Sequence, residues 1–459
     1  MEYTRHLAQF ATQLQYADLP SPVIEKAKAI ALHAWGVQLA GSTLPWSKAA
    51  YRYVQSQGGA PQSSVINYGL KTSAINAAFV NGTFGHGFEM DDNHAATGIK
   101  GGCVVLPTCL AIGEQQNSSG RDIILATVVA YEVMTRVGLS VNPTLLNGAH
   151  HPTGTCAPFG AASAAGKLLG FDDTTMLHAI SIAAGHSSGL GEAPASGRGD
   201  LKRIFGGMAA ANGIRSALLA REGLTGPATM LEGKRGFCRA FGDTSKLPAL
   251  TAGLGTQWQI LNVHYKIYAQ DGYIQPMTEA LDRILKAREF KAEDIEEIRA
   301  GTNQHALDVV SLIREPKDLT SAQFSANFSL ALFLVKGNAG FQEYTEENLV
   351  DSNIIALSRK IRIELDPEIE DEWQKTRPRG ARVTVRLKSG KIYTECVHML
   401  RSMSAADVVD KVRKLATVAL DAEQSERLIA TVQNLDALQD LSTLVPLLVR
   451  EHGDQGTAS

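Results

Sequence analysis

Apolar residues recur at the spacing of an α-helix through most of the first 260 positions of the chain. In residues 23–39, Ser21 is a suitable N-cap, Pro22 fits the first helical position and Gly41 can end the helix. The same spacing predicts helices at residues 46–54, 72–84, 104–114, 121–141, 157–169, 172–184 and 200–221. Ser119 is expected to cap the helix at 121–141. Almost no stretch before residue 260 alternates with a period of two, so we predict that this part is helical.

The pattern changes after about residue 268, where short alternating runs predict strands between helices. The predicted strands are residues 295–302, residues 361–365, and residues 382–387 and 392–397, which form a hairpin around Ser389-Gly390. Helical spacing between these runs predicts helices at 273–288, 321–336 and 346–358. From residue 405 onward the spacing is helical again.

These patterns predict a mainly α protein with a large all-helical domain and a smaller inserted α+β lid domain. The helical domain would be discontinuous, comprising residues 1–267 and 402–459, and the lid would comprise residues 268–401, a normal size for a domain. Two independent helical units, one before and one after the α+β part, are the alternative.

Composition is typical of a soluble globular protein, with 44% hydrophobic and 20% charged residues among 459. A net charge of −3 without a long basic run argues against nucleic-acid binding. The N-terminus lacks an apolar signal segment, and the longest apolar run, near residues 123–131, is short of the roughly 20 residues that span a bilayer. No C-x-x-C pair occurs, so we expect reduced thiols in the cytoplasm, without disulfides or structural zinc. The five cysteines are Cys103, Cys109, Cys156, Cys238 and Cys396.

A dense polar stretch, residues 86–94, follows the small-residue helix predicted at 72–84. It contains two histidines, three carboxylates and an amide, which are costly to bury and unnecessary for folding. Its imidazoles and carboxylates could bind a divalent metal, although the adjacent Asp91 and Asp92 would point apart on a helix. The carboxylates could also cap neighbouring helices. Because a glycine-rich loop follows, where backbone can approach a ligand, we favour acid–base chemistry.

Two further polar islands interrupt Ala- and Gly-rich sequence. His151 precedes Pro152, which biases it to extended geometry ahead of the helix at 157–169, where an anion could bind the helix N-terminus. Because histidine exchanges protons near neutral pH, we predict a site role for His151 rather than a structural one. Lys202 and Arg203 lead into a small, apolar helix, where a cation would bind a carboxylate; ordinary surface charge is the alternative.

Lys266 and Tyr268 lie at the predicted junction of the two domains, where ligand clefts are frequent, and could close a site from the lid side. A solvated connector is the alternative. The chain has no G-x-x-x-x-G-K-[S/T] loop and no G-x-G-x-x-G after a strand, so it lacks the signatures of phosphate and dinucleotide binding. We expect the polar islands to converge on one pocket.

Taken together, these blocks resemble the MmgE/PrpD family, whose members include 2-methylcitrate dehydratase, cis-aconitate decarboxylase and iminodisuccinate epimerase. The resemblance is carried by residues 86–94 with Val105-Leu106-Pro107, His151 followed by residues 159–170, Lys202 ten residues before Asn212-Gly213, and Lys266-Ile267-Tyr268. The order and spacing of the blocks match along nearly the whole chain.

The resemblance implies a helical domain with an α+β lid, a homodimer, and an active site between the domains without metal or other cofactor. It implies a lyase, either a dehydratase or a decarboxylase, that moves protons at a carbon next to a carboxylate of a small di- or tricarboxylate. His151, Lys202, Glu89 and Asp91 match the family's catalytic positions. The expected substrate-binding residues are Asp92, Asn93, Lys100, Arg203, Lys266, Tyr268 and Phe328.

Three of these positions depart from the family pattern. Asn93 stands where an animal member carries a threonine, Lys100 stands where that member carries a histidine, and Phe328 replaces a site tyrosine. Losing a hydroxyl and gaining a cation would change proton delivery and carboxylate contacts.

In the predicted mechanism, Lys202 pairs with a substrate carboxylate, with a second cation in support, and stabilises enolate-like charge as it develops. His151 acts as general base or acid at the adjacent carbon, and Glu89 or Asp91 is the second proton carrier or orients a histidine. An isomerase or epimerase with two proton carriers is one alternative. A non-catalytic carboxylate-binding protein is the other.

Overall fold

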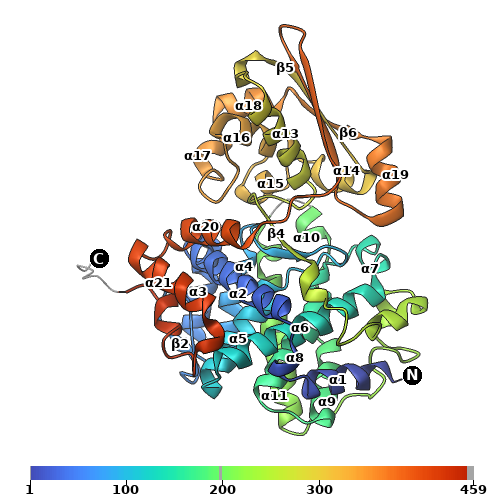
Figure 1. Ribbon diagram of the computed structural model, residues 1–459, viewed down its shortest axis with the longest axis vertical. Coiled ribbons are helices and arrows are strands. Elements are labelled where there is room, and N and C mark those ends of the chain that lie inside the picture. Colours follow the sequence, from blue (N-terminus) through green and yellow to red (C-terminus); the bar gives the residue numbers. More distant parts are fainter. Residues whose placement is uncertain (1, 196–198, 452–459) are drawn as a thin grey trace.

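The computed structural model describes residues 2–195 and 199–451 and consists of two parts (Figure 1). A helical body forms the lower part of the view, and a smaller part above it combines helices with a four-stranded sheet. The structure is mainly α-helical, as the hydrophobic pattern predicts.

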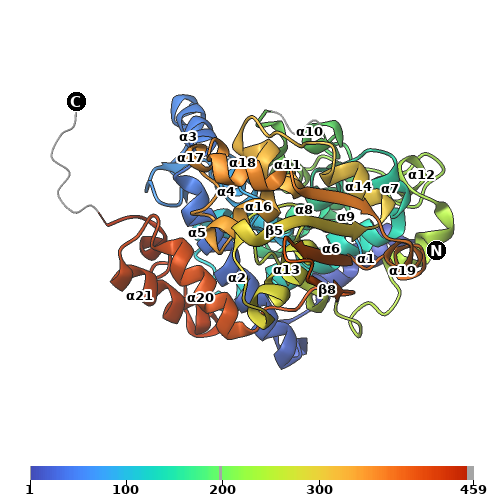
Figure 2. The same cartoon turned by 90° about the horizontal axis from the view of Figure 1, so that it is seen from above.

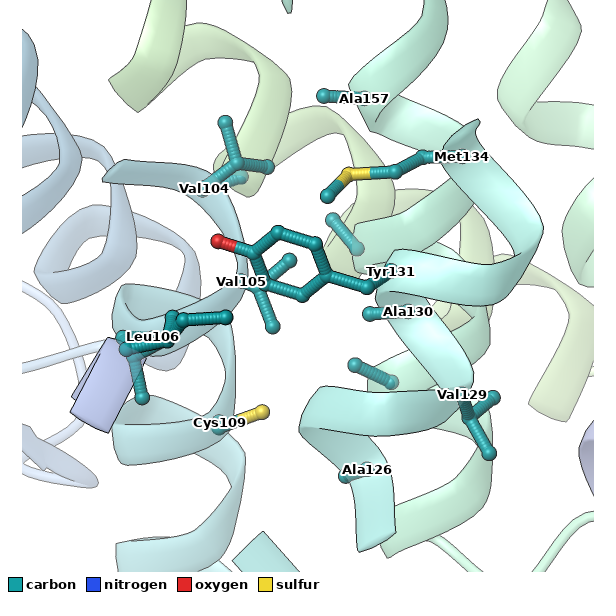
Figure 3. Packing of buried hydrophobic residues seen from close by; sticks show 14 of the residues in the cluster. Val104, Val105, Leu106, Cys109, Ala126, Val129, Ala130, Tyr131, Met134 and Ala157 are labelled. Carbon is teal, nitrogen blue, oxygen red and sulfur yellow. The ribbon is translucent and has the colours of Figure 1, made fainter. Parts of the chain in front are cut away.

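The helical body contains most of the helices predicted before residue 260. Its longer helices are α1 (Tyr3–Gln13), α2 (Ser21–Ser42), α3 (Pro45–Gln57), α4 (Ala74–His86), α5 (Gly102–Gln116), α6 (Gly120–Val141), α8 (Pro152–Leu168), α9 (Asp173–Ala184) and α11 (Phe205–Arg221). Shorter helices are α7 (Thr144–Asn147), α10 (Glu192–Ala195) and α12 (Phe237–Phe241). Figure 3 shows Tyr131 and Met134 of α6 in the core of the body, with Val104 and Val105 of α5 across from them. All four side chains are fully buried, so this packing contributes to the main hydrophobic cluster.

The helix ends test the capping predictions. Helix α2 begins at Ser21 itself and runs past Gly41, so the predicted cap and end are wrong by about one residue. Gly41 instead serves packing, because a β-carbon there would lie 2.0 Å from the carbonyl oxygen of Phe84 in α4. Ser119 caps α6 as predicted, since its hydroxyl accepts the Asp122 N–H while the Asp122 carboxylate accepts the Ser119 N–H.

Helix α6 has the predicted extent to within one residue, and by length and composition it could cross a bilayer. In the structure, however, 94% of its most apolar stretch is buried inside the protein. A core helix of a globular protein passes the same length criterion, so α6 is weak evidence for a membrane span.

The upper part contains every strand predicted after residue 268. The sheet has the order β6 (Ile361–Leu365), β5 (Ile295–Thr302), β7 (Ala381–Leu387) and β8 (Ile392–Val397). β5 pairs parallel with β6 and antiparallel with β7, and β7 pairs antiparallel with β8. The predicted hairpin is confirmed, with Gly390 in its turn at φ +86°, a conformation that favours glycine.

Two helices predicted in the upper part are each broken into two. Residues 321–336 form α15 (Leu319–Gln323) and α16 (Ala326–Lys336), because Ser325 caps the second helix; residues 346–358 form α17 (Glu346–Leu349) and α18 (Ser352–Ser358), where Asp351 is the cap. The other helices of this part are α13 (Gln275–Ala287), α14 (Gln304–Val310) and α19 (Pro367–Thr376).

The chain returns to the helical body after β8. Helices α20 (Ala405–Ala416) and α21 (Ala422–Gln433) lie on the body, together at one side of the molecule (Figures 1 and 2). Val408 and Val412 join the core of the body, whereas Leu415 joins the core of the upper part. Helix α20 therefore contributes to both cores, and the domain boundaries at residues 267 and 402 stay a prediction.

Short strands that the sequence did not predict bring distant segments together. β3 (Asp92–His94) pairs antiparallel with β4 (Val263–Tyr265), so that Asp92 is opposite Tyr265. Two more, β1 (Ser63–Ser64) and β2 (Lys71–Thr72), pair with each other. The β3–β4 pair places the polar stretch 86–94 beside the segment that carries Lys266.

Candidate active site

The candidate site is built on the turn between α4 and β3. His86 is the last residue of α4, and the chain then turns through Glu89 before entering β3 at Asp92. Glu89 adopts φ +54°, a left-handed conformation that is unfavourable for a residue with a side chain. The stretch is therefore not a continuous helix, and the prediction that Asp91 and Asp92 lie on one helix is wrong.

Glu89 lies between two lysines that come from distant parts of the sequence. One carboxylate oxygen accepts a hydrogen bond from Lys202 Nζ and the other accepts one from Lys266 Nζ. Lys266 Nζ also lies 3.6 Å from Asp91 Oδ1. All four side chains are buried. Buried charges need partners of opposite sign. The two ammonium groups therefore form a gap that binds one carboxylate, and in this structure Glu89 occupies the gap.

Lys202 lies on a short 3₁₀ helix, Leu201–Ile204, that leads into α11. Burial, together with the positive charges of Lys266 and Arg203, lowers the pKa of Lys202 well below its ordinary value. A bound carboxylate counteracts this effect by stabilising the ammonium form. The ordinary-surface alternative for Lys202 is wrong because the side chain is buried, and its role in binding a substrate anion stays a prediction.

His86 and Asp91 form a second polar pair in the site. His86 Nδ1 lies 2.5 Å from Asp91 Oδ2. Burial and the nearby Lys202 lower the pKa of His86 well below its ordinary value, whereas burial raises the pKa of Asp91. These opposite shifts favour a pair that shares one proton over a charged imidazolium–carboxylate pair.

His151 lies against this pair. It is the N-cap residue of α8, which begins at Pro152 and not near residue 157, and its N–H donates to the Gly189 carbonyl at 3.0 Å. Its ring centroid lies 5.5 Å from that of His86. Within the described part of the chain, His151 Nδ1 and His86 Nε2 are buried without hydrogen-bond partners. Burial and Lys100 lower the pKa of His151 well below the ordinary range, so its imidazole is neutral near pH 7.

Lys100 adds a further cation. Its backbone N–H donates to Thr153 Oγ1 at 3.0 Å, which ties the loop before α5 to the start of α8. Burial and the charge of Lys266 lower the pKa of Lys100 to about 8, while Asp91 acts in the opposite direction. No described residue forms an ion pair with Lys100, so its ammonium group is available to a ligand.

Asp92 and Asn93 differ from each other in how their side-chain oxygens are paired, and substrate binding by either stays a prediction. Asp92 Oδ1 accepts the Gly102 N–H at 2.7 Å, and Oδ2 accepts the Tyr131 hydroxyl at 2.6 Å. Both oxygens serve the protein, so Asp92 joins β3 to α5 and α6. Burial raises the pKa of Asp92 to about 6. Asn93 pairs with His264 across the strands, and its buried Oδ1 has no partner among the described residues.

Arg203 is held by protein groups around the Glu89 turn. Its Nε donates to Asp200 at 2.9 Å, and its two terminal nitrogens donate to the Gly87 carbonyl and the Thr320 hydroxyl. The guanidinium lies 3.4 Å from the ring centroid of Trp46. Each nitrogen has one protein partner, so Arg203 supports the Glu89 turn, and a further contact with substrate stays a prediction.

Two predicted substrate contacts lie in the core of the upper part. The Tyr268 ring packs against Phe333 at a centroid distance of 5.5 Å, and Phe328 is 6.4 Å from Tyr344. Both side chains are buried in the second hydrophobic cluster. Burial raises the pKa of Tyr268, and the charged groups that act on it belong to α13 and Arg401, not to the lysine–carboxylate cluster. In this conformation neither side chain joins that cluster, because each is part of the apolar packing.

A metal is the alternative explanation of the acidic stretch. The donor atoms of His86, Asp91 and Cys103 lie within 4.8 Å of one another. Burial, however, raises the pKa of Cys103 well above its ordinary value, so the thiol stays protonated at neutral pH. Lys202 and Lys266 already supply positive charge to the site. The donor set therefore fits a divalent cation poorly, and a metal-free site stays our prediction.

Two residues that the sequence analysis did not select contact the site from outside. Lys411 Nζ of α20 donates to the carbonyls of Met90 and Lys266, and Gln323 Nε2 of α15 donates to those of Phe88 and Ala269. A signal for Lys411 was present, since it interrupts the apolar stripe of α20. Nothing in the spacing around Gln323 marks it.

Family models match most of the chain. Residues 5–249 match the MmgE/PrpD N-terminal domain, and residues 268–437 match the MmgE/PrpD C-terminal domain. The second match extends beyond residue 401 and includes α20 and α21. Lys266 lies in the stretch between the two matches.

Similar proteins align along almost their entire length. A cis-aconitate decarboxylase-like protein of Aspergillus oryzae is 28% identical, with 98% of this chain and 97% of that protein aligned. Cis-aconitate decarboxylase of Aspergillus terreus is also 28% identical, with 97% and 95% aligned. The Homo sapiens cis-aconitate decarboxylase is 26% identical, with 95% and 92% aligned.

Proposed function

Because the chain belongs to the MmgE/PrpD family, we propose that it is a lyase that removes carbon dioxide or water from a small di- or tricarboxylate. The names of the similar proteins make cis-aconitate the first substrate to test. The observation that carries the proposal is the position of the Glu89 carboxylate between Lys202 and Lys266. The same gap would accept a substrate carboxylate.

The substrate carboxylate would replace one or both contacts of Glu89 with the lysines. Lys100 would bind a second carboxylate, since its ammonium has no ion-pair partner among the described residues. The lysines would then stabilise the negative charge that develops when a bond next to the carboxylate breaks.

For decarboxylation, the bond to the departing carboxylate breaks and its electron pair enters the system conjugated to the carboxylate held by the lysines. Carbon dioxide leaves, and one proton is added to carbon. His151 would donate this proton to carbon. The proton shared by His86 and Asp91 would then replace the one that His151 has lost. For dehydration, the neutral His151 would instead abstract a proton while hydroxide leaves with a proton from the second carrier.

The test is a screen of small carboxylic acids with purified protein in heavy water, followed by mass spectrometry and NMR. Loss of carbon dioxide from cis-aconitate, with one solvent deuteron in the product, is the expected result. Loss of water from a hydroxy tricarboxylate would keep the lyase class and change the substrate. Deuterium exchange without loss of either molecule would favour the epimerase alternative, and binding without exchange would favour a non-catalytic protein; either would overturn the proposal.

A further inference from the structure

The turn that carries Glu89 and the segment that carries Lys266 must keep a fixed distance for the carboxylate gap to exist. Glu89 holds a left-handed backbone conformation at φ +54°, which is unfavourable for a residue with a side chain. Such a conformation persists only when surrounding groups hold it. The β3–β4 pair fixes one end of the arrangement, since it begins at Asp92 and leaves residues 87–91 outside the strands.

Lys411 bridges the two segments on one side of Glu89. Its Nζ donates to the Met90 carbonyl at 3.1 Å, to the Lys266 carbonyl at 2.7 Å and to His33 Nε2 at 2.8 Å. In its ammonium form Lys411 has three N–H donors, one for each of these three acceptors. Each acceptor is neutral because burial also lowers the pKa of His33 well below its ordinary value. Burial without a contacting carboxylate lowers the pKa of Lys411 to about 7, and such burial of a lysine is not needed to fold α20.

Gln323 bridges the same two segments on the other side of Glu89. Its Nε2 donates to the Phe88 carbonyl at 2.8 Å and to the Ala269 carbonyl at 2.8 Å. The side chain is buried, and both amide N–H donors are used. Two carbonyls are both acceptors and cannot hydrogen-bond each other. An amide with two N–H donors, placed between them, can join the two backbone segments.

The two bridges are arranged alike. The carbonyls before and after Glu89 are each tied to a carbonyl of the 266–269 segment, one by Lys411 of α20 and the other by Gln323 of α15. We propose that Lys411 and Gln323 are positioning residues that hold the Glu89 turn against the Lys266 segment and so set the width of the carboxylate gap. The catalytic consequence rests on the proposed function, whereas the structural consequence does not.

The experiment compares Lys411→Met and Gln323→Met with Lys414→Met and Gln374→Met. Lys414 is an exposed lysine of the same helix, and Gln374 is an exposed glutamine of α19. Methionine keeps the length of the side chain and removes the donors, and a cavity of about 360 Å³ beside Lys411 gives the variant room to repack. Folding is checked by near-ultraviolet circular dichroism. Lys411→Arg, which retains charge and donors, is a second variant if Lys411→Met does not fold.

Backbone hydrogen exchange of the peptides covering residues 87–94 and 263–270 is the first measurement. Loss of either bridge is expected to accelerate exchange in both peptides by about tenfold or more, because each bridge contains two hydrogen bonds. The control variants are expected to exchange like wild type, and Lys411→Arg is expected to fall between wild type and Lys411→Met. Unchanged exchange in both Lys411→Met and Gln323→Met would overturn the proposal.

Turnover of the substrate found for wild type is the second measurement. Both positioning variants are expected to lose kcat by roughly tenfold with a smaller change in KM, because the groups remain but are misplaced. If wild type turns over no carboxylate while exchange responds as expected, the proposed function fails and the positioning role stands. If wild type is active and both variants match it in exchange and kcat, the positioning role fails alone.

Discussion

Two buried charge clusters in the helical body differ in how completely their polar atoms are paired. In α6, Arg136 Nε lies 3.3 Å from Glu132 Oε2, and both side chains are almost fully buried. The terminal nitrogens of Arg136 donate to three carbonyls, and the second oxygen of Glu132 accepts a backbone N–H. These backbone partners are Ala252, Gly253, Gln257 and Ile260.

In the cluster around Glu89, by contrast, some buried polar atoms have no hydrogen-bond partner in the part of the chain that the structure describes. Among the described residues, three of its buried polar atoms have no hydrogen-bond partner: His86 Nε2, Asp91 Oδ1 and His151 Nδ1. Its two lysines share the Glu89 carboxylate, and Lys266 Nζ also lies 3.6 Å from Asp91 Oδ1. A buried ion pair whose atoms are all satisfied joins two parts of a fold, whereas one with free donors and acceptors is prepared for a ligand. The same chemical groups thus serve structure in one place and suit chemistry in the other.

The strongest test of this difference is Lys202→Met. Removing one of the two cations that face the carboxylate gap is expected to lower kcat/KM by about a thousandfold, because charge developing on the substrate loses its main stabilisation. The thermal midpoint is expected to fall, but by less than in the Arg136 cluster, because Glu89 loses one donor and keeps Lys266. Steady-state turnover and thermal unfolding measure the two effects. Turnover near that of wild type would contradict the assignment.

The corresponding change in the satisfied cluster is Arg136→Met. It leaves Glu132 and three backbone carbonyls without their partner, so the free energy of unfolding is expected to fall by about 3–5 kcal/mol. Burial already raises the pKa of Glu132 to about 7. Without Arg136 that carboxyl takes up a proton more readily, so the loss should be larger above about pH 8 than below about pH 6. Urea titrations at both pH values measure this, with activity per folded molecule as the control. If Arg136→Met lowered activity without lowering the free energy of unfolding, the contrast between the two clusters would be wrong.

His151→Gln tests the unpaired imidazole. We expect roughly a hundredfold loss of kcat, because glutamine retains polarity and size but exchanges no proton near neutral pH. His150→Gln is the matched control, since His150 is the neighbouring histidine and its ring packs against Phe241 at the protein periphery. Equal effects of the two changes would indicate a structural role for this segment.

The smallest expected effect is the pH dependence that Lys100 gives to kcat/KM. Its pKa of about 8 means that the ammonium form is present below this pH and is lost above it. Binding of an anion favours the protonated form, so kcat/KM should fall above about pH 8 by up to about tenfold per pH unit. Lys100→Arg should remove the decline, because arginine keeps its charge at these pH values. A decline that persists in Lys100→Arg would assign it to another lysine, such as Lys411, whose pKa burial lowers to about 7.

The correct and incorrect predictions have a common explanation. Helices, the sheet strands and the Ser119 cap depend on neighbours a few residues away, and these were predicted well. Arg203 and Tyr268 were selected for their chemistry and position in the chain, yet their side chains bind Gly87 and pack against Phe333. Composition cannot distinguish a cation that faces substrate from one that holds a carbonyl, because both look the same in sequence.

By itself, the sequence determined the helical body, the four sheet strands and the types of group in the site, since periodicity and residue chemistry are local properties. The tertiary structure decided which groups meet. Lys202 and Lys266 lie 113 and 177 positions from Glu89, and only chain packing brings their ammonium groups to the two oxygens of one carboxylate. It also decided which charges are left unpaired, because satisfaction of a buried atom depends on every element packed against it.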